Sequence, residues 1–196
     1  MKNIDHFDDF ISLLENTMKE YRDIKTLIEK DNLSERFEDL QKTNELAMLF
    51  TVANSDLTIS LKNLHIVKND SEKLFFVKNI FLTIHETIVA YQGNGKFINN
   101  LCQTYDETKD AYKIVTDNLR KFKKDHDYER YIIPMRNSIS AHIDIDSFYD
   151  ETIQIDINKI LEMTLQFGQK FLSTAISLVK ILLKYLINNF LSQSSL

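Results

Sequence analysis

The chain has 196 residues and one cysteine, Cys102, and its 29 acidic and 24 basic residues give a formal net charge of −5. A single cysteine excludes an internal disulfide, argues against a multi-cysteine metal site and fits a reducing, cytoplasmic setting. The acidic balance argues against a broad nucleic-acid surface, because neutralising phosphates requires clustered lysine and arginine. The length fits a single domain over residues 1–196 that buries its own core.

Apolar residues in the N-terminal third recur at steps of three and four, the period of an amphipathic helix. They predict one helix over about residues 5–30 and a second over residues 37–67, with a candidate break at "QKTNE" (41–45). Residues 1–12 contain three aspartates where a secretory signal would have basic and apolar residues, so we expect no signal peptide.

A polar run, "NDSEK" (69–73), separates the second helix from a third apolar stripe at residues 74–91. Asp70 or Ser71 is the expected N-cap of this third helix, because a short polar side chain can accept a hydrogen bond from the first turn. We expect "GNG" (93–95) to end the helix, since glycine and asparagine tolerate the left-handed conformation of a C-terminal cap.

A heptad-like apolar series over residues 97–122 predicts a fourth helix, which "KDHDYE" (124–129) then turns. The densest basic run of the chain, "RKFKK" (120–124), lies at its C-terminal end. One interpretation is a solvated helix end, where cations face the negative end of the helix dipole. The other is a small basic site, formed by Arg120, Lys121, Lys123 and Lys124.

The C-terminal region begins with "TIQIDI" (152–157), which alternates as a strand does but is short and isolated, so we interpret it as an extended linker. A final helix is expected over about residues 158–191. It is not expected to span a membrane, because Lys180 and Lys184 would each cost roughly 2.5–3.5 kcal/mol at mid-membrane. Its polar stripe favours a helix buried in a bundle or at a subunit contact. The whole pattern predicts an all-α, up-and-down bundle of about six helices.

The only proline of the chain lies in "YIIPMRNSISAHIDID" (131–146). A proline is favoured in the first turn of a helix and pushes the residue before it, here Ile133, out of the helical region. We therefore expect a helix to restart or kink at Pro134, with Arg136 in its first turn. Free N–H groups there, together with the guanidinium, would favour an anion.

His142 follows Arg136 by six residues, and an ideal helix would turn the two side chains well apart. They could meet on one ligand only through a kink, a long arginine reach or a second subunit. Histidine changes its charge near neutral pH, as acid–base catalysis requires. The spacing alone favours an ordinary helix with a packed or capped histidine.

The other four histidines are weaker candidates. His65 and His85 lie among apolar neighbours on periodic helices, which favours buried, hydrogen-bonded core histidines, and His6 and His126 are expected to be solvated. "HETIV" (85–89) lacks the second histidine of a zinc-protease motif, and the chain has no glycine-rich phosphate loop. We therefore expect neither a metal nor a cofactor.

The sequence "RNSISAH" (136–142) resembles the R-(x)4–6-H motif of the HEPN superfamily, small helical bundles common in toxins, abortive-infection proteins and RNA-cleaving defence systems. Asn137 after the arginine and Ala141 before the histidine both match the usual form of the motif. Residues 56–88 are similar, more loosely, to the helix pair that precedes the motif in abortive-infection members, including an acidic residue like Glu86.

The resemblance implies a metal-independent endoribonuclease, a toxin or antiphage defence effector, in which the RNA 2′-hydroxyl attacks the neighbouring phosphate. His142 would be general base or acid, Arg136 would stabilise the charged phosphorane, and Asn137 would orient the phosphate or the histidine. Family members usually form homodimers in which two motifs face each other across a dyad. The residues expected to contact the RNA substrate are Glu86, Arg120, Lys121, Lys123 and Lys124.

Two other classes remain open. The first is a catalytically silent HEPN-like module that binds a nucleotide or a protein partner, such as a cognate antitoxin or the nucleotidyltransferase often paired with the family. The acidic composition and the lack of a broad basic surface favour it. The second is a plain helical scaffold in which the motif is accidental.

Overall fold

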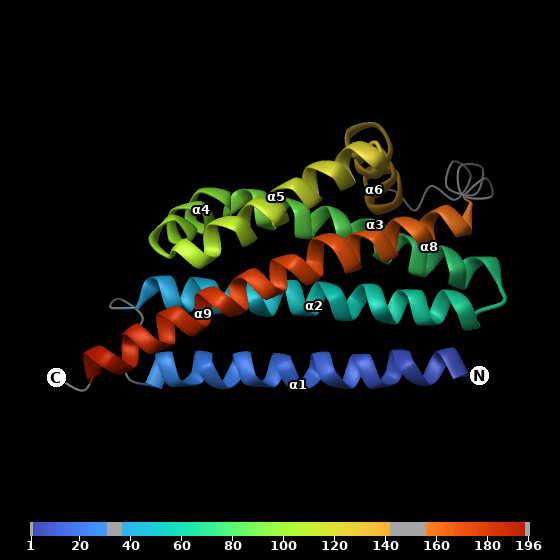
Figure 1. Ribbon diagram of the computed structural model, residues 1–196. Helices are drawn as coiled ribbons and strands as arrows, with labels where there is room; N and C mark the ends of the chain where they lie inside the picture. Colours follow the sequence, from blue (N-terminus) through green and yellow to red (C-terminus); the bar gives the residue numbers. More distant parts are fainter. Residues whose placement is uncertain (1, 31–36, 142–155, 195–196) are drawn as a thin grey trace.

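The computed structural model describes residues 2–30, 37–141 and 156–194 (Figure 1). In this part of the chain 94% of the residues are helical, no strand is present, and the helices form seven continuous segments. The predicted all-α bundle is confirmed, and its helix number is close to the expected six.

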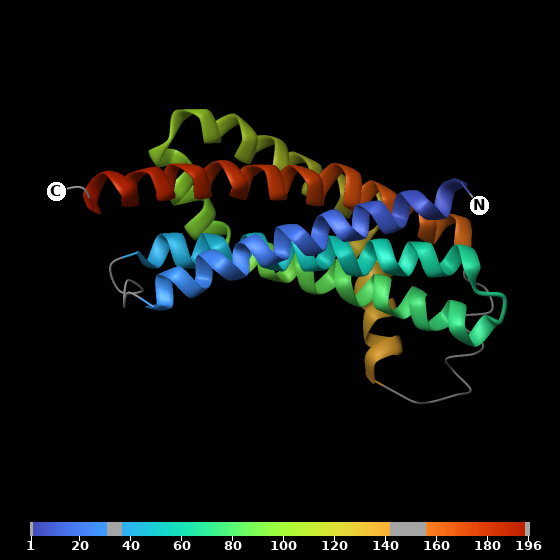
Figure 2. The same cartoon turned by 90° about the horizontal axis from the view of Figure 1, so that it is seen from below.

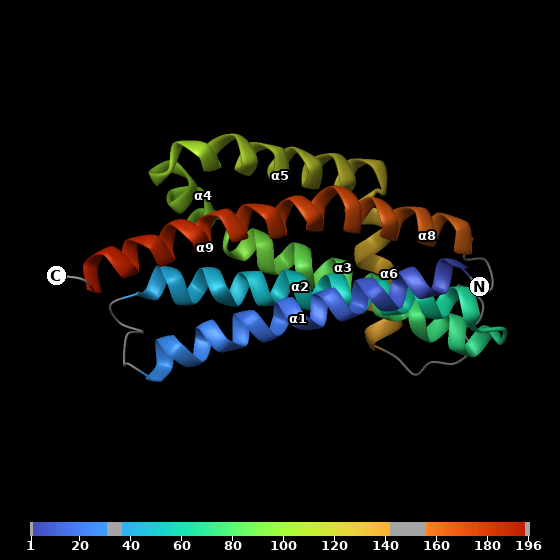
Figure 3. The same cartoon turned by 60° about the horizontal axis from the view of Figure 1, so that its bottom comes forward.

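The long helices alternate in direction, and α9 lies between α5 and α2 (Figures 1 and 3). The first five elements are α1 (Lys2–Lys30), α2 (Glu38–Ile66), α3 (Asp70–Gly93), α4 (Gly95–Thr104) and α5 (Asp106–Asp125). The others are the π-helical turn η1 (Tyr128–Ile132), α6 (Ile133–Ala141), α8 (Ile157–Gln166), the π-helical turn η2 (Phe167–Leu172) and α9 (Ser173–Ser194).

A chain of buried aromatic rings crosses the core and connects four elements. Phe122 of α5 lies 4.9 Å from Phe167 of η2, measured between ring centroids, and Phe167 lies 5.1 Å from Phe171. Phe171 meets Tyr91 of α3 edge to face at 5.3 Å, and Tyr91 lies 6.3 Å from Phe50 of α2. Large rings dominate core energetics, so this chain fixes α2, α3 and α5 around the last helical segment.

The candidate break at residues 41–45 is wrong, because α2 continues through it. Asn44 is buried there, and its Nδ2 donates a hydrogen bond of 2.8 Å to the backbone oxygen of Tyr21 in α1. The polar run therefore includes an inward-facing contact between two helices rather than a loop.

The boundaries of α3 differ in detail from the prediction. Asn69, rather than Asp70 or Ser71, is the N-cap, and its side chain accepts a hydrogen bond of 2.8 Å from the backbone N–H of Glu72. The helix ends at Gly93 as predicted, but Asn94 has φ −98° and no glycine within the described residues has a positive φ. The expected left-handed cap is therefore wrong.

The predicted fourth helix is two helices, α4 and α5, separated at Tyr105. Tyr105 is extended, with φ −121° and ψ 116°, and Thr108 donates from its hydroxyl to the carbonyl oxygens of Cys102 and Tyr105 at 2.9 and 2.6 Å. The bond to Cys102 satisfies a carbonyl near the end of α4, where helical partners are lost, whereas the carbonyl of Tyr105 also accepts from the backbone N–H of Thr108 at 3.0 Å. Apolar spacing continues across the break, so periodicity alone does not reveal it.

Two helical segments, Asp70–Gly93 and Ile157–Ser192, are long and apolar enough to cross a membrane by length and composition. This criterion is weak, because the core helix of a globular bundle also passes it. In the second segment the apolar side chains of Leu178 and Leu182 are buried, while Lys180 is exposed. Part of the apolar face of this segment thus packs inside the chain, and its expected share in a subunit contact stays a prediction.

We predict that Phe171→Ala lowers the free energy of unfolding by about 3–5 kcal/mol, the usual cost of removing a large ring from a closed core. Phe171 is fully buried between the rings of Phe167 and Tyr91. Urea unfolding followed by circular dichroism measures the loss. Leu27→Ala is the control, because Leu27 is 63% exposed. This substitution should change the free energy of unfolding by no more than about 0.5 kcal/mol. Equal losses in the two variants would contradict this description of the core.

Candidate functional site at the crossing of α3 and α6

The helix that contains the motif does not start anew at Pro134, so the predicted restart is wrong, but the change from π-helical to α-helical structure lies beside the proline, between Ile132 and Ile133. Helical structure runs from Tyr128 through η1 into α6, and Ile133 is itself helical with φ −63° and ψ −50°. The N–H of Ile133 donates to the carbonyl of Tyr128, five residues earlier. This wider turn moves the preceding carbonyls out of the register in which a proline ring clashes. Arg136 therefore lies beyond the first turn of the helical run that begins at Tyr128. It does not stand at a helix N-terminus, so the anion site expected there is not formed around it.

Arg136 instead forms an ion pair between two helices. Its Nη2 lies 2.7 Å from Oε1 of Glu86 in α3, and its Nη1 donates to Oδ1 of Asn137 at 3.2 Å. The side chain of Arg136 is 32% exposed and that of Glu86 is 53% exposed. The ion pair therefore holds the guanidinium in one direction, and one side of the pair stays open to solvent. Figure 2 shows α6 crossing α3 on the side away from α2 and α9.

His85, the neighbour of Glu86 on α3, forms a second contact with the same helical segment. Its Nδ1 shares a hydrogen bond of 2.9 Å with the hydroxyl of Tyr128, and the two rings are nearly parallel, 5.9 Å apart. Partial burial and hydrogen bonding of His85 agree with the prediction. Its position beside the motif was not predicted.

Charges around these groups set their protonation. Burial lowers the pKa of His85, the charge of Arg136 lowers it further, and Glu86 and Glu129 raise it in opposition. Burial also raises the pKa of Tyr128 to about 12. At neutral pH the site therefore contains a neutral histidine and a protonated tyrosine beside the permanent cation of Arg136.

Lys123 is the member of the basic run that joins this cluster. Its Nζ lies 2.9 Å from Oε1 of Glu129 and 4.3 Å from the centroid of the Tyr128 ring, within the range of a cation–π contact. The cluster thus extends from the end of α5 through η1 to α3.

The rest of the basic run does not converge on the cluster. Arg120 pairs with Asp117 at 3.2 Å and Lys121 pairs with Asp125 at 2.6 Å, both on α5 itself. Hydrogen bonding from Lys121 lowers the pKa of Asp125. Lys124 is exposed at the end of the helix. These pairs fit the solvated helix end, the first of the two interpretations of the run.

His142 lies outside the residues that the structure describes, so the approach of His142 to Arg136 stays a prediction. Ala141 is the last described residue of α6, and only its backbone is placed. The linker expected at 152–157 also lies outside, except for Asp156 and Ile157, which begin α8.

Two of the three remaining histidines differ from expectation. His65 is exposed and meets Phe7 of α1 edge to face at 6.0 Å, so it is not the core residue that was predicted. His126, expected to be solvated, is partly buried and hydrogen-bonded through Nε2 to Gln166 at 3.0 Å. His6 is exposed as predicted.

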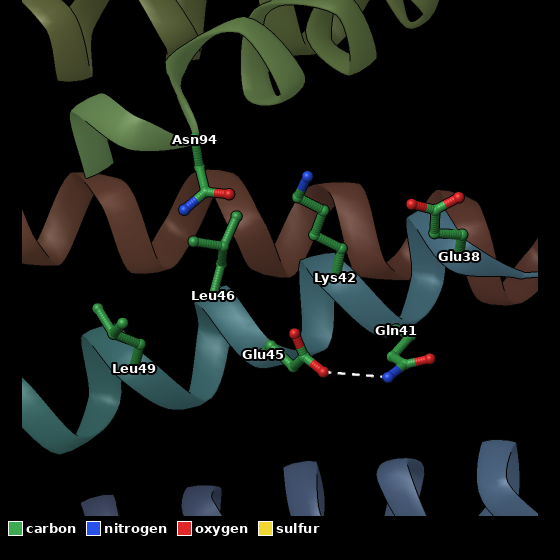
Figure 4. A pocket seen from close by; sticks show the side chains of 7 residues that line it. All are labelled: Glu38, Gln41, Lys42, Glu45, Leu46, Leu49 and Asn94. Atoms are coloured by element: carbon green, nitrogen blue, oxygen red, sulfur yellow. Dashed lines mark hydrogen bonds between the residues drawn. The ribbon is translucent and has the colours of Figure 1, made fainter. Parts of the chain in front are cut away.

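In the described part of the chain, neither a metal-binding cluster nor the hollow beside Asn94 adds to this site. No cluster of three or more His, Cys, Asp or Glu side chains that could hold a metal occurs in the described part of the chain. Cys102 is buried, and burial raises the pKa of its thiol to about 11. A hollow of about 350 Å³ between α2 and Asn94 is open (Figure 4). Its lysine, Lys42, lies over the ring of Phe97 at 4.7 Å.

No protein-family model matches the sequence, and no curated protein or solved structure matches the chain. Membership of the HEPN superfamily therefore stays a prediction that depends on residues 136–142 and, more loosely, on residues 56–88.

We predict that the free energy of unfolding falls as the pH drops below about 6.5, because the unfolded chain then binds a proton that folded His85 resists. His85→Gln retains a polar group for Tyr128 but cannot titrate. The free energy of unfolding of this variant should therefore fall less between about pH 7 and about pH 5.5 than that of wild type. Denaturant unfolding at the two pH values measures both. His65→Gln, at an exposed position, is the matched control and should behave as wild type. If the free energy of unfolding of His85→Gln depends on pH as steeply as that of wild type, the lowered pKa of His85 in the folded protein is refuted.

Proposed function

We propose that this protein is a metal-independent endoribonuclease of HEPN type that acts as a homodimer. The observation that most supports the proposal is the ion pair between Glu86 and Arg136. The motif arginine and the acidic residue, found separately in the sequence by resemblance, lie 2.7 Å apart although 50 positions separate them. The two residues that the resemblance selects are thus neighbours in the fold, as a shared site requires.

Each group has a role in the proposed reaction. A base, His142, takes the proton of the RNA 2′-hydroxyl, whose oxygen attacks the adjacent phosphorus. The bond to the 5′-oxygen breaks, a proton is delivered to that oxygen, and a 2′,3′-cyclic phosphate and a 5′-hydroxyl result. Arg136 stabilises the doubly charged phosphorane, since donors already oriented toward developing charge lose little in reorganisation. Glu86 and Asn137 hold the guanidinium in one orientation.

The second subunit supplies the remaining proton transfer. One histidine acts as base and its counterpart across the dyad acts as acid, which also removes the difficulty of the six-residue spacing on one helix. RNA binding at such a site depends on few cations. Arg120, Lys121 and Lys123 already have acidic partners, so we expect binding to be weak or to require a particular RNA structure.

The same ion pairs support a second candidate, a silent HEPN-like module that binds a protein partner, such as a cognate antitoxin or a nucleotidyltransferase, or a nucleotide. A surface whose lysines are neutralised within the chain suits a protein partner better than an extended phosphate backbone. The two candidates differ in whether purified protein cleaves RNA by itself.

We predict that the wild-type protein cleaves RNA in the presence of EDTA and leaves 2′,3′-cyclic phosphate and 5′-hydroxyl ends. DNA and RNA with a 2′-O-methyl group at the cleaved position should resist, because the attacking hydroxyl is missing. His142→Ala should reduce the rate about 10²–10⁴-fold, the usual worth of a proton-transfer group. Arg136→Ala should also reduce it strongly. Gel analysis with end-group mapping measures these effects.

His65→Ala is the matched control, because it removes an exposed histidine on the distant contact between α1 and α2 and should leave the rate unchanged. Circular dichroism of each variant checks folding. If wild type cleaves no RNA, or if His142→Ala cleaves as fast as wild type, the silent binding module is the better account.

A further inference from the structure

Helix α1 packs along one side of α2 and has no other extensive contact with a described element (Figure 1). Its buried side chains, Leu14, Tyr21 and Ile28, are spaced by seven and form a single narrow stripe. Such a stripe is typical of the seam of a two-stranded coiled coil, whereas a core helix has a wider apolar face. Removal of α1 would therefore leave the contacts of α2 with α3 and α9 in place.

The face of α2 that receives this stripe is mostly polar. Asn44 and Lys62 identify the face, because the first bonds the backbone of Tyr21 and the second forms an ion pair with Asp8. An ideal helix places six residues within roughly 40° of this direction: Asn44, Met48, Thr51, Ser55, Thr58 and Lys62. Met48 is the one apolar residue of the six, although the seam of a stable coiled coil is apolar at most positions.

The polar groups of this face gain little from the contact with α1. Oδ1 of Asn44 is buried and has no hydrogen-bond partner among the described residues, and such an atom destabilises the contact that buries it. The hydroxyls of Thr51 and Thr58 donate to the carbonyls of Ala47 and Asn54 at 2.8 and 2.6 Å. Their protons are therefore used within α2 and not toward α1. The seam thus holds α1 less firmly than the aromatic core holds the other long helices.

We propose that α1 is a releasable arm, which undocks from α2 as one unit while the rest of the described chain stays folded. A helix held by few buried apolar contacts opens at a lower free energy than the core. Asn44, Thr51 and Thr58 can bond water once α1 leaves, so opening uncovers a polar face and not the apolar core. The apolar surface that opening exposes belongs to α1 itself, at Leu14 and Ile28.

This device is independent of the proposed RNA chemistry. Glu86 and Arg136 lie on α3 and α6, with which α1 has no extensive contact. Undocking of α1 therefore leaves the ion pair intact, and hydrogen exchange tests the arm whether or not the protein cleaves RNA.

The first test is amide hydrogen exchange of the wild-type chain, measured by mass spectrometry on peptides. Peptides from α1 should exchange together and at least about tenfold faster than peptides from α3, yet more slowly than an unstructured peptide. Equal rates in α1 and α3 would mean that α1 opens only when the whole bundle unfolds. Exchange of α1 at the rate of an unstructured peptide would mean that it is not docked. Either result overturns the proposal.

The second test makes the seam apolar. Thr51→Val/Thr58→Val replaces two hydroxyls by methyl groups, which adds apolar contact with α1 and should slow the exchange of α1 about tenfold. Thr87→Val is the matched control, because Thr87 is buried on α3 and its hydroxyl also donates to the carbonyl four residues earlier, at 2.6 Å. It should leave α1 at the wild-type rate, since α1 opens without unfolding α3. An unchanged rate of α1 in the seam variant, or equal slowing by Thr87→Val, would overturn the proposal.

Discussion

The contact between the aromatic rings of η2 and those of α3 and α5 is the interaction on which the position of the candidate site depends. Phe171 packs against Tyr91 and Phe167 packs against Phe122, so the middle of the last helical segment joins two helices that have no other extensive contact. Because rings in a close-packed core cannot shift independently, the end of α5 has a fixed position over α3. The segment that follows α5 must therefore start at a defined place above α3, and the candidate site depends on that geometry.

Two successive residues of α3 then hold this segment at two points. His85 bonds Tyr128 at the start of η1, and Glu86 pairs with Arg136 two turns later in α6. Asp127, with φ 44°, turns the chain between α5 and η1. A partly buried ion pair of this type contributes more to specificity of arrangement than to stability. It fixes the direction of a guanidinium on an open surface, as a site for a phosphate requires.

Helical periodicity was sufficient to predict the class of the fold and most helix boundaries, because burial of apolar faces determines both. It could not reveal the break at Tyr105, where the apolar spacing continues, or the π turn before Pro134, which leaves no periodic signal. Arg136, Asn137 and Glu86 were predicted as site residues from resemblance, but their contact joins positions 50 apart and depends on the packing of α5. The same applies to Tyr128 and His85, whose sequence neighbours give no sign of their contact.

The central claim is that Glu86 and Arg136 act as one unit on the phosphate of an RNA substrate. A double-mutant cycle on kcat/KM with Glu86→Gln, Arg136→Gln and the double variant tests it most directly, because residues that act together lose far less in combination than the sum of their separate losses. We expect the double variant to cleave RNA about as slowly as Arg136→Gln alone. Additive losses, or cleavage by all three variants at the wild-type rate, would contradict the claim.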